Sequence, residues 1–244
     1  MRRRIELGRL FGIPILLDTS WFIMLALVAW TLATGYFPAH MPGMGVAAYW
    51  FMGLVAAVLL FLCVLLHELG HSLVAKGYGI PVNRVTLFVF GGVAQIASDP
   101  KRPLVELAVA LAGPLVSAVI AAGCFWASSH VVVQTHAQVV SLSIVRYLAV
   151  VNVAILVFNL LPGFPLDGGR VLRAALWAWW GDFRKATRIA TLLGSALGIG
   201  LLALGLVSVI QGRWISGLWD ILLGTFLRNA AKVSYAEVVM RGST

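Results

Sequence analysis

Long apolar stretches follow one another along this chain, separated by short polar segments. A helix that crosses a bilayer needs about 20 predominantly apolar residues. Six stretches reach or approach that length: 19–37, 47–76, 104–128, 138–161, 187–210 and 214–231. The pattern therefore predicts an all-α polytopic membrane protein with about six transmembrane helices, and the apolar run from 104 to 133 allows more than one placement of its helix ends.

Residues 82–97 interrupt this helical pattern with the sequence VNRVTLFVFGGVAQIA. The segment is rich in β-branched and aromatic residues around Gly91-Gly92, a pair typical of a two-residue hairpin turn. We therefore expect a small membrane-associated β-hairpin, whose edges must be paired, covered or solvated. Two interpretations stay open, an ordinary cytoplasmic loop or an edge on which a substrate strand docks.

Composition supports the membrane interpretation. The chain is 61% hydrophobic and only 11% charged, whereas soluble domains are about a quarter charged. The net charge of +9 does not indicate a nucleic-acid partner, because the basic residues lie between apolar stretches and form no basic stripe. The two cysteines, Cys63 and Cys124, both lie in apolar stretches, so we expect no disulfide framework.

The placement of Lys and Arg predicts the orientation. These residues concentrate before the first stretch, between the second and third, between the fourth and fifth, and at the end, whereas 38–46 and 129–137 contain none. The positive-inside rule then places both termini in the cytoplasm of a plasma-membrane protein. The N-terminal segment begins like a signal peptide, but Pro14 and Asp18 interrupt it without a cleavage site, so we expect a retained cytoplasmic segment.

The second apolar stretch contains the motif His67-Glu68-Leu69-Gly70-His71. On a helix this H-E-x-x-H spacing places both histidines on one face, one turn apart, where they can share one Zn²⁺. Glu68 lies beside them and can take a proton from a metal-associated water. Cys63, one turn before His67, either approaches the metal or is a small core residue, and we favour the core residue.

Chance matches to this motif occur in soluble helices, and a single buried histidine is more often a core residue than a ligand. The membrane changes that balance. A charged residue at the centre of a span costs about 2.5–3.5 kcal/mol on insertion scales, so ionisable residues in spans are usually functional. Three of them, His67, Glu68 and His71, within five positions of one span therefore favour a metal site.

A catalytic zinc needs a third protein ligand and an open position. Three acids lie in or beside other spans. Glu106 resembles an interfacial residue, and Asp220 either packs between helices or pairs with Arg228. Asp167 follows a segment with two prolines, and such irregular backbone at membrane depth suits a cavity-lining ligand. Without the histidine motif, Asp167 would be read as the N-cap of the next helix.

Four motifs together resemble the site-2 protease family of intramembrane zinc metalloproteases, in its prokaryotic branch. They are HELGH at 67–71, FVFGG at 88–92, AGPLVS at 112–117 and NLLPGFPLDGGR at 159–170. The resemblance covers about residues 1–232. It implies a six-helix core, one zinc per chain held by His67, His71 and Asp167, and Glu68 as the catalytic acid/base.

The resemblance also implies further roles. Asn159 matches an asparagine that holds substrate or the oxyanion near zinc, and Gly91 and Gly92 match the hairpin glycines of a substrate-binding strand. Ser117 departs from the asparagine that many relatives carry after AGP, a change expected to affect packing more than the metal. Residues 233–244 are expected to be an irregular tail or a linker, and they resemble the lead-in to a cytoplasmic regulatory (CBS-like) domain.

The expected function is hydrolysis of peptide bonds within or near transmembrane segments, that is, regulated intramembrane proteolysis. The expected partners are the lipid bilayer and a transmembrane substrate, for which the resemblance suggests an anti-sigma factor or a signal-peptide remnant. The alternatives are a zinc-dependent membrane transporter and a non-catalytic membrane scaffold. The absence of internal repeats disfavours the transporter, and the intact Glu68 disfavours the scaffold.

Overall fold

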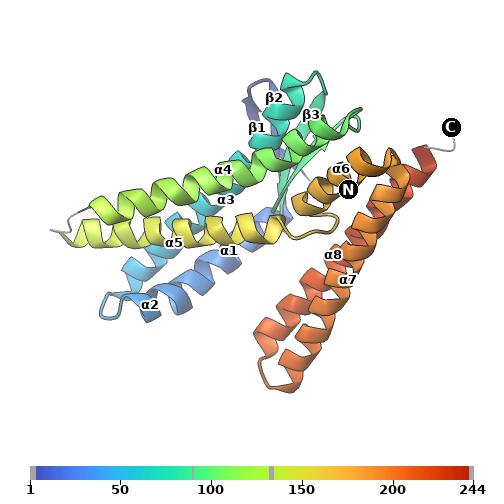
Figure 1. Cartoon of the computed structure of the whole chain (residues 1–244). Coiled ribbons are helices and arrows are strands. Elements are labelled where there is room, and N and C mark those ends of the chain that lie inside the picture. Colours follow the sequence, from blue (N-terminus) through green and yellow to red (C-terminus); the bar gives the residue numbers. More distant parts are fainter. Residues whose placement is uncertain (1–3, 90, 132–134, 242–244) are drawn as a thin grey trace. The chain divides into compact units, whose positions relative to one another are not determined.

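The computed structural model describes residues 4–89, 91–131 and 135–241 (Figure 1). The chain divides into two compact units. The first consists of Met1–Asp99 with Ala112–Leu156, and the second of Pro100–Leu111 with Val157–Thr244. Two long helices, α4 (Pro103–His130) and α5 (His136–Asn159), contribute residues to both units.

The first unit contains the N-terminal helices. A continuous helical stretch is formed by α1 (Ser20–Thr31), the π-helical turn η1 (Leu32–Tyr36) and α2 (Phe37–His40). It packs against α3 (Val46–Gly77). Phe37, Met52 and Ala56 are completely buried in the cluster between these helices and α5. Cys63 belongs to the same cluster, as expected of a small core residue.

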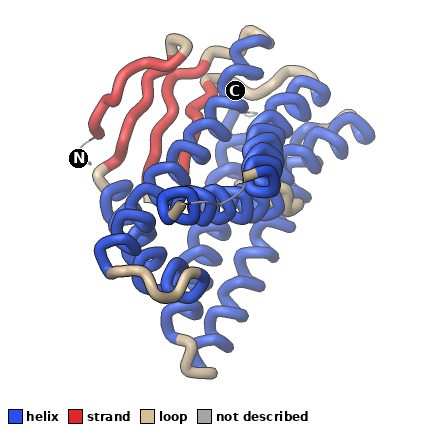
Figure 2. The backbone as a smooth tube through the Cα atoms, turned by 90° about the vertical axis from the view of Figure 1, so that its left-hand side faces the viewer, coloured by secondary structure: helices blue, strands red, loops and turns tan. Residues whose placement is uncertain are grey.

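A four-stranded sheet completes the first unit (Figure 2). Its strands, in spatial order, are β1 (Arg4–Leu10), β2 (Ile13–Asp18), β3 (Val82–Phe88) and β4 (Gly91–Ile96). The β2–β3 pair is parallel and the two outer pairs are antiparallel. Alternate residues of β2 are buried on Leu65 and Leu69 of α3, so the sheet is fixed to the helix that carries the histidine motif.

The sequence did not predict β1 and β2. We expected an N-terminal cytoplasmic segment, interrupted at Pro14, and assigned it no strands. The structure instead forms a hairpin whose turn residues, Phe11 and Gly12, both have positive φ, of 52° and 77°. That backbone matches the right-handed twist of the flanking strands. Lys76, near the end of α3, donates a 2.8 Å hydrogen bond to the Phe11 carbonyl and holds the turn in place.

The second unit contains the C-terminal helices α6 (Asp167–Trp180), α7 (Phe183–Ile210) and α8 (Trp214–Arg241). α7 packs along both of its neighbours, and most extensively along α8. We expected an irregular tail after Lys232, but α8 continues as far as Arg241. The expected linker therefore begins as helix in the part of the chain that the structure describes.

Helices cover nearly all of the six predicted spans. Five of them have ends within a few residues of those expected, whereas α8, which contains the sixth, continues from 231 to Arg241. Among the described residues, five helices are long and apolar enough to cross a membrane: Ser20–His40, Val46–Gly77, Pro103–His130, His136–Asn159 and Phe183–Ile210. The sixth expected span lies in α8, which is not among the five, since Asp220 and Arg228 lower its hydropathy.

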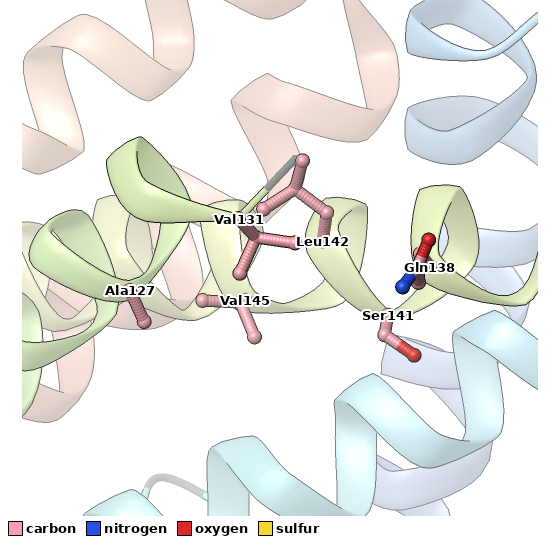
Figure 3. A pocket seen from close by; sticks show the side chains of 6 residues that line it. All are labelled: Ala127, Val131, Gln138, Ser141, Leu142 and Val145. Atoms are coloured by element: carbon pink, nitrogen blue, oxygen red, sulfur yellow. The ribbon is translucent and has the colours of Figure 1, made fainter. Parts of the chain in front are cut away.

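A small pocket of about 110 Å³ lies where α4 ends and α5 begins (Figure 3). It is lined by Ala127, Val131, Gln138, Ser141, Leu142 and Val145. These lining residues include no histidine, cysteine or carboxylate. The pocket therefore contains none of the usual protein ligands of zinc.

Candidate metal centre

His67 and His71 converge on one point beside α3. Both side chains are buried, with 3% and 4% of their surfaces exposed. Their Nε2 atoms lie 3.2 Å apart, with the two rings nearly perpendicular. Two nitrogens bound tetrahedrally to zinc at about 2.1 Å would lie about 3.4 Å apart. The pair of imidazoles therefore fits a shared zinc ion.

Ser117 of α4 orients the first of these rings. Its Oγ lies 2.9 Å from His67 Nδ1, in hydrogen-bonding contact. A hydrogen bond on one ring nitrogen fixes the orientation of the ring and leaves the other nitrogen available for the metal. The expectation that Ser117 affects packing more than the metal site is therefore wrong. No local signal in the sequence reveals this contact, because the two residues are 50 positions apart.

Gly113 keeps the space in front of the ring nitrogens open. A Cβ atom at this position would lie 2.2 Å from His71 Nε2 and 2.6 Å from His67 Nε2. Real Cβ atoms essentially never approach other heavy atoms so closely. The glycine of the AGP motif thus has a physical role, since any side chain there would fill the position that the metal needs.

Glu68 is held against the edge strand β4. Its Oε2 accepts a 3.0 Å hydrogen bond from the backbone N–H of Ala94. A Cβ atom on Gly92 would lie only 2.5 Å from Glu68 Cγ, so a larger residue at this position would force the glutamate or the strand to shift. The sheet therefore fixes the direction of the carboxylate that lies beside the histidine pair.

The predicted hairpin is present, but its glycines are not in the turn. Gly91 pairs with Phe88 and Gly92 with Leu87, so both belong to β4. Val89, directly after β3, is a turn residue, and position 90 lies outside the described residues. The Val89 N–H donates a 3.2 Å hydrogen bond to Ser20 Oγ, which ties the turn to α1.

Asp167 lies in the second unit, as the first residue of α6, and is 8% exposed. The N-cap position of this helix is Leu166, with no side-chain capping bond. The alternative that Asp167 is merely an N-cap is therefore wrong. Asn159 also lies in the second unit, as the partly buried last residue of α5.

Glu106 is not the interfacial residue that the sequence indicated. It is completely buried in the first turn of α4 and forms an ion pair with Arg173 of α6. The sequence could not reveal this pair, because its members are 67 positions apart.

A comparison with models of protein families identifies the family of this chain. The model of Peptidase family M50 matches residues 55–139 and 128–201, a region that includes the histidine motif and Asp167. The chain belongs to peptidase family M50. The predicted resemblance to site-2 proteases is thereby confirmed.

Two proteins that are similar in sequence to this M50 member are named as zinc metalloproteases. One, sll0528 of Synechocystis, is 40% identical over 231 residues, which are 95% of this chain and 59% of that protein. The other, Rip3 of Mycobacterium tuberculosis, is 37% identical over 232 residues, 95% of this chain and 58% of that protein. The chain thus spans less than two thirds of the length of these relatives.

A solved structure shares the fold. The site-2 protease from Methanocaldococcus jannaschii is 30% identical, with a TM-score of 0.64, and the match covers 96% of this chain and 95% of that one. The chain is therefore a multi-pass membrane protein with the site-2 protease fold. The geometry of the histidine pair fits a zinc ion, and the names of both relatives describe zinc metalloproteases.

Proposed function

We propose that this chain is an intramembrane zinc metalloprotease that hydrolyses peptide bonds within or near transmembrane segments of membrane proteins. The observation that carries the proposal is the position of Glu68, half-buried beside two converging imidazoles on a membrane-capable helix. No observation favours the transporter or the scaffold. A scaffold would not need the carboxylate, and both relatives have metalloprotease names.

We propose that Asp167 completes a set of three zinc ligands with His67 and His71. Three protein ligands and one open position are the usual arrangement of a catalytic zinc. Asp167 is buried, as His67 and His71 are, and carboxylate oxygens bind zinc at about the same distance as imidazole nitrogens. Asp167 follows an irregular segment directly and is the first residue of α6, so the proposed ligand lies at the start of this helix.

The catalytic role of Glu68 follows from its charge and its anchoring. Zinc, when bound, supplies Lewis-acid polarisation of a water molecule and of the scissile carbonyl group. Glu68 accepts the proton of the attacking water and then delivers it to the leaving amine. The Ala94 N–H holds one carboxylate oxygen, which leaves the other to exchange the proton. Asn159 is proposed to donate a hydrogen bond to the developing oxyanion.

The substrate is proposed to bind as an extra strand along β4. A transmembrane helix must unwind before its carbonyl groups become accessible, and the backbone groups that it frees need new partners. β4 is the outermost strand of the sheet, so one of its edges has no neighbouring strand among the described residues. Gly91 and Gly92 would let an unwound segment approach this edge closely, beside Glu68.

The remaining expectations concern the cellular setting. Both termini are proposed to be cytoplasmic in the plasma membrane, on the basis of the Lys and Arg distribution. Water would then enter from the cytoplasm. Residues 1–232 are proposed to form the protease core, with 233–244 leading to a CBS-like domain. The proposed substrates are an anti-sigma factor or a signal-peptide remnant.

The substitution Glu68→Gln tests the proposed catalytic role. It keeps the size of the side chain and removes the base, so we expect cleavage to fall by about 10²–10⁴-fold, while bound zinc stays unchanged. The measurements are turnover of labelled single-span membrane proteins, including both proposed substrate types, and zinc content by mass spectrometry. Glu6→Gln, at an exposed glutamate of β1, is the matched control. Normal cleavage by the Glu68→Gln protein would refute the assignment.

A further inference from the structure

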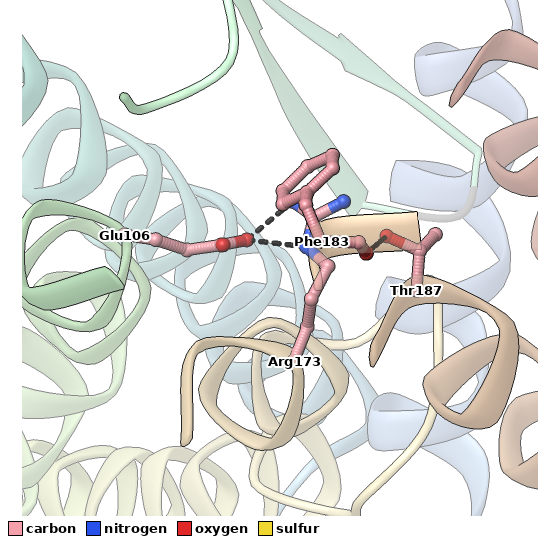
Figure 4. Close-up of polar contacts among 4 residues, drawn as sticks. All are labelled: Glu106, Arg173, Phe183 and Thr187. Atoms are coloured by element: carbon pink, nitrogen blue, oxygen red, sulfur yellow. Dashed lines mark hydrogen bonds and ion pairs between the residues drawn. The ribbon is translucent and has the colours of Figure 1, made fainter. Parts of the chain in front are cut away.

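The second unit contains a buried ion pair that the proposed mechanism does not use. Arg173 of α6 donates hydrogen bonds from Nε, at 2.6 Å, and from Nη2 to the same oxygen, Oε1, of Glu106 in α4 (Figure 4). Glu106 is fully buried and Arg173 is 5% exposed. Such a pair loses its hydration on folding, and apolar residues of similar volume are often at least as stabilising. Stability alone is therefore a weak reason for its presence.

Two aromatic rings hold the guanidinium group of Arg173. Its Cζ atom lies 4.7 Å from the ring centre of Phe164 and 4.6 Å from that of Phe183. The planar, delocalised guanidinium stacks on rings and donates several hydrogen bonds at once, which the ammonium group of lysine does not do. Arg173 therefore connects the start of α4, the segment before α6 and the start of α7.

Phe164, one of the two rings that contact Arg173, belongs to the backbone segment directly before Asp167. The Phe164 N–H donates a 3.0 Å hydrogen bond to the Ala190 carbonyl of α7, and the Leu166 N–H donates one of the same length to Gly163. Asp167 follows directly and begins α6. Arg173 lies on this same helix, so a contact that fixes Arg173 and Phe164 fixes the helix and its entry segment together.

We propose that Glu106 and Arg173 are positioning residues, which hold Asp167 in the direction required to bind zinc. The inference rests on the proposed role of Asp167 as a ligand. Contacts that orient metal ligands typically change metal affinity by about 10–100-fold when removed. We expect a loss of zinc affinity in this range when the pair is removed.

The test uses the full-length protein in detergent and an apolar replacement of both partners, Glu106→Met with Arg173→Met. Removing both charges avoids leaving one buried charge unpaired, so the protein is expected to fold. Zinc affinity is measured by competition with a chelator, and the absorption spectrum of the cobalt-substituted protein reports ligand geometry. Arg173→Lys serves as the conservative variant, and Lys185→Met, which removes an exposed cation stacked on Trp180, is the control.

We expect the double variant to show native helix content, zinc binding weakened by about 10–100-fold, and an altered cobalt spectrum. Arg173→Lys should recover part of the affinity, and Lys185→Met should match the parent protein. A folded double variant with unchanged zinc affinity and cobalt spectrum would overturn the inference. Asp167→Ala separates the two proposals: if it binds zinc normally, Asp167 is not a ligand, and the failure lies with the proposed zinc site.

Discussion

At the scale of single residues, the candidate metal centre depends on two glycines as well as on its ionisable side chains. Gly113 leaves space in front of the two imidazole nitrogens, and Gly92 leaves space beside Glu68. Neither glycine has a positive φ, so backbone conformation does not require them. What requires them is the close approach of neighbouring backbone to the reactive side chains.

The substitution Gly92→Ala tests this at Glu68. The new Cβ atom would lie 2.5 Å from Glu68 Cγ, so the glutamate or the strand must move. Because misplacement by about 1 Å can cost about 10²-fold in rate, we expect kcat to fall by roughly that factor while zinc content stays constant. Kinetic analysis in parallel with metal analysis checks this.

A suitable control is Gly123→Ala, in α4, where an added Cβ meets no atom within 4 Å. This variant should retain parental kcat and zinc content. If the Gly92→Ala protein instead has the kcat of the parent, the close approach of β4 does not determine the catalytic position of Glu68.

At the scale of secondary-structure elements, the sequence predicts elements whose signal is local. The H-E-x-x-H motif and the apolar stretches are such signals, and the corresponding helices are present. The sequence also predicts the hairpin at 82–97 but places its turn at the wrong residues. A glycine pair usually marks a turn, whereas here both glycines lie in β4 and Gly92 lies close to the side chain of Glu68. The sequence does not predict the β1–β2 hairpin, because Pro14 and Asp18 only indicate that the N-terminal apolar stretch is not a signal peptide, whereas both residues lie within β2.

The start of α6 provides a prediction at this scale. A Cβ atom on Gly168 would lie 2.2 Å from the Leu160 carbonyl oxygen, so α6 can begin against this segment only with glycine. We expect Gly168→Ala to destabilise the second unit by about 1–3 kcal/mol, the usual cost of overpacking. The thermal unfolding midpoint in detergent measures this change.

Gly200→Ala, in α7, is the matched control, because an added Cβ there has no neighbour within 4 Å. Alanine also has a higher helix propensity than glycine, so this control should keep or slightly raise the midpoint. Equal midpoints for Gly168→Ala and Gly200→Ala would contradict the packing argument.

At the scale of the whole molecule, the proposal is one hydrolytic centre within a multi-pass membrane protein. The sequence predicted the residue types of this centre, since a membrane span rarely contains His, Glu and His within five positions without a function. It did not predict the contacts that orient them. Ser117 lies 50 positions from His67, and Glu106 lies 67 positions from Arg173, so only the folded chain brings these pairs together.

The zinc content of the purified protein tests the central claim most directly. We expect one zinc per chain in the parent protein, measured by mass spectrometry after extensive dialysis. His71→Ala removes one of the two converging nitrogens and should lose the metal, whereas His40→Ala, at an exposed histidine of α2, should retain it. A parent protein free of zinc, or full zinc content in the His71→Ala protein, would contradict the account.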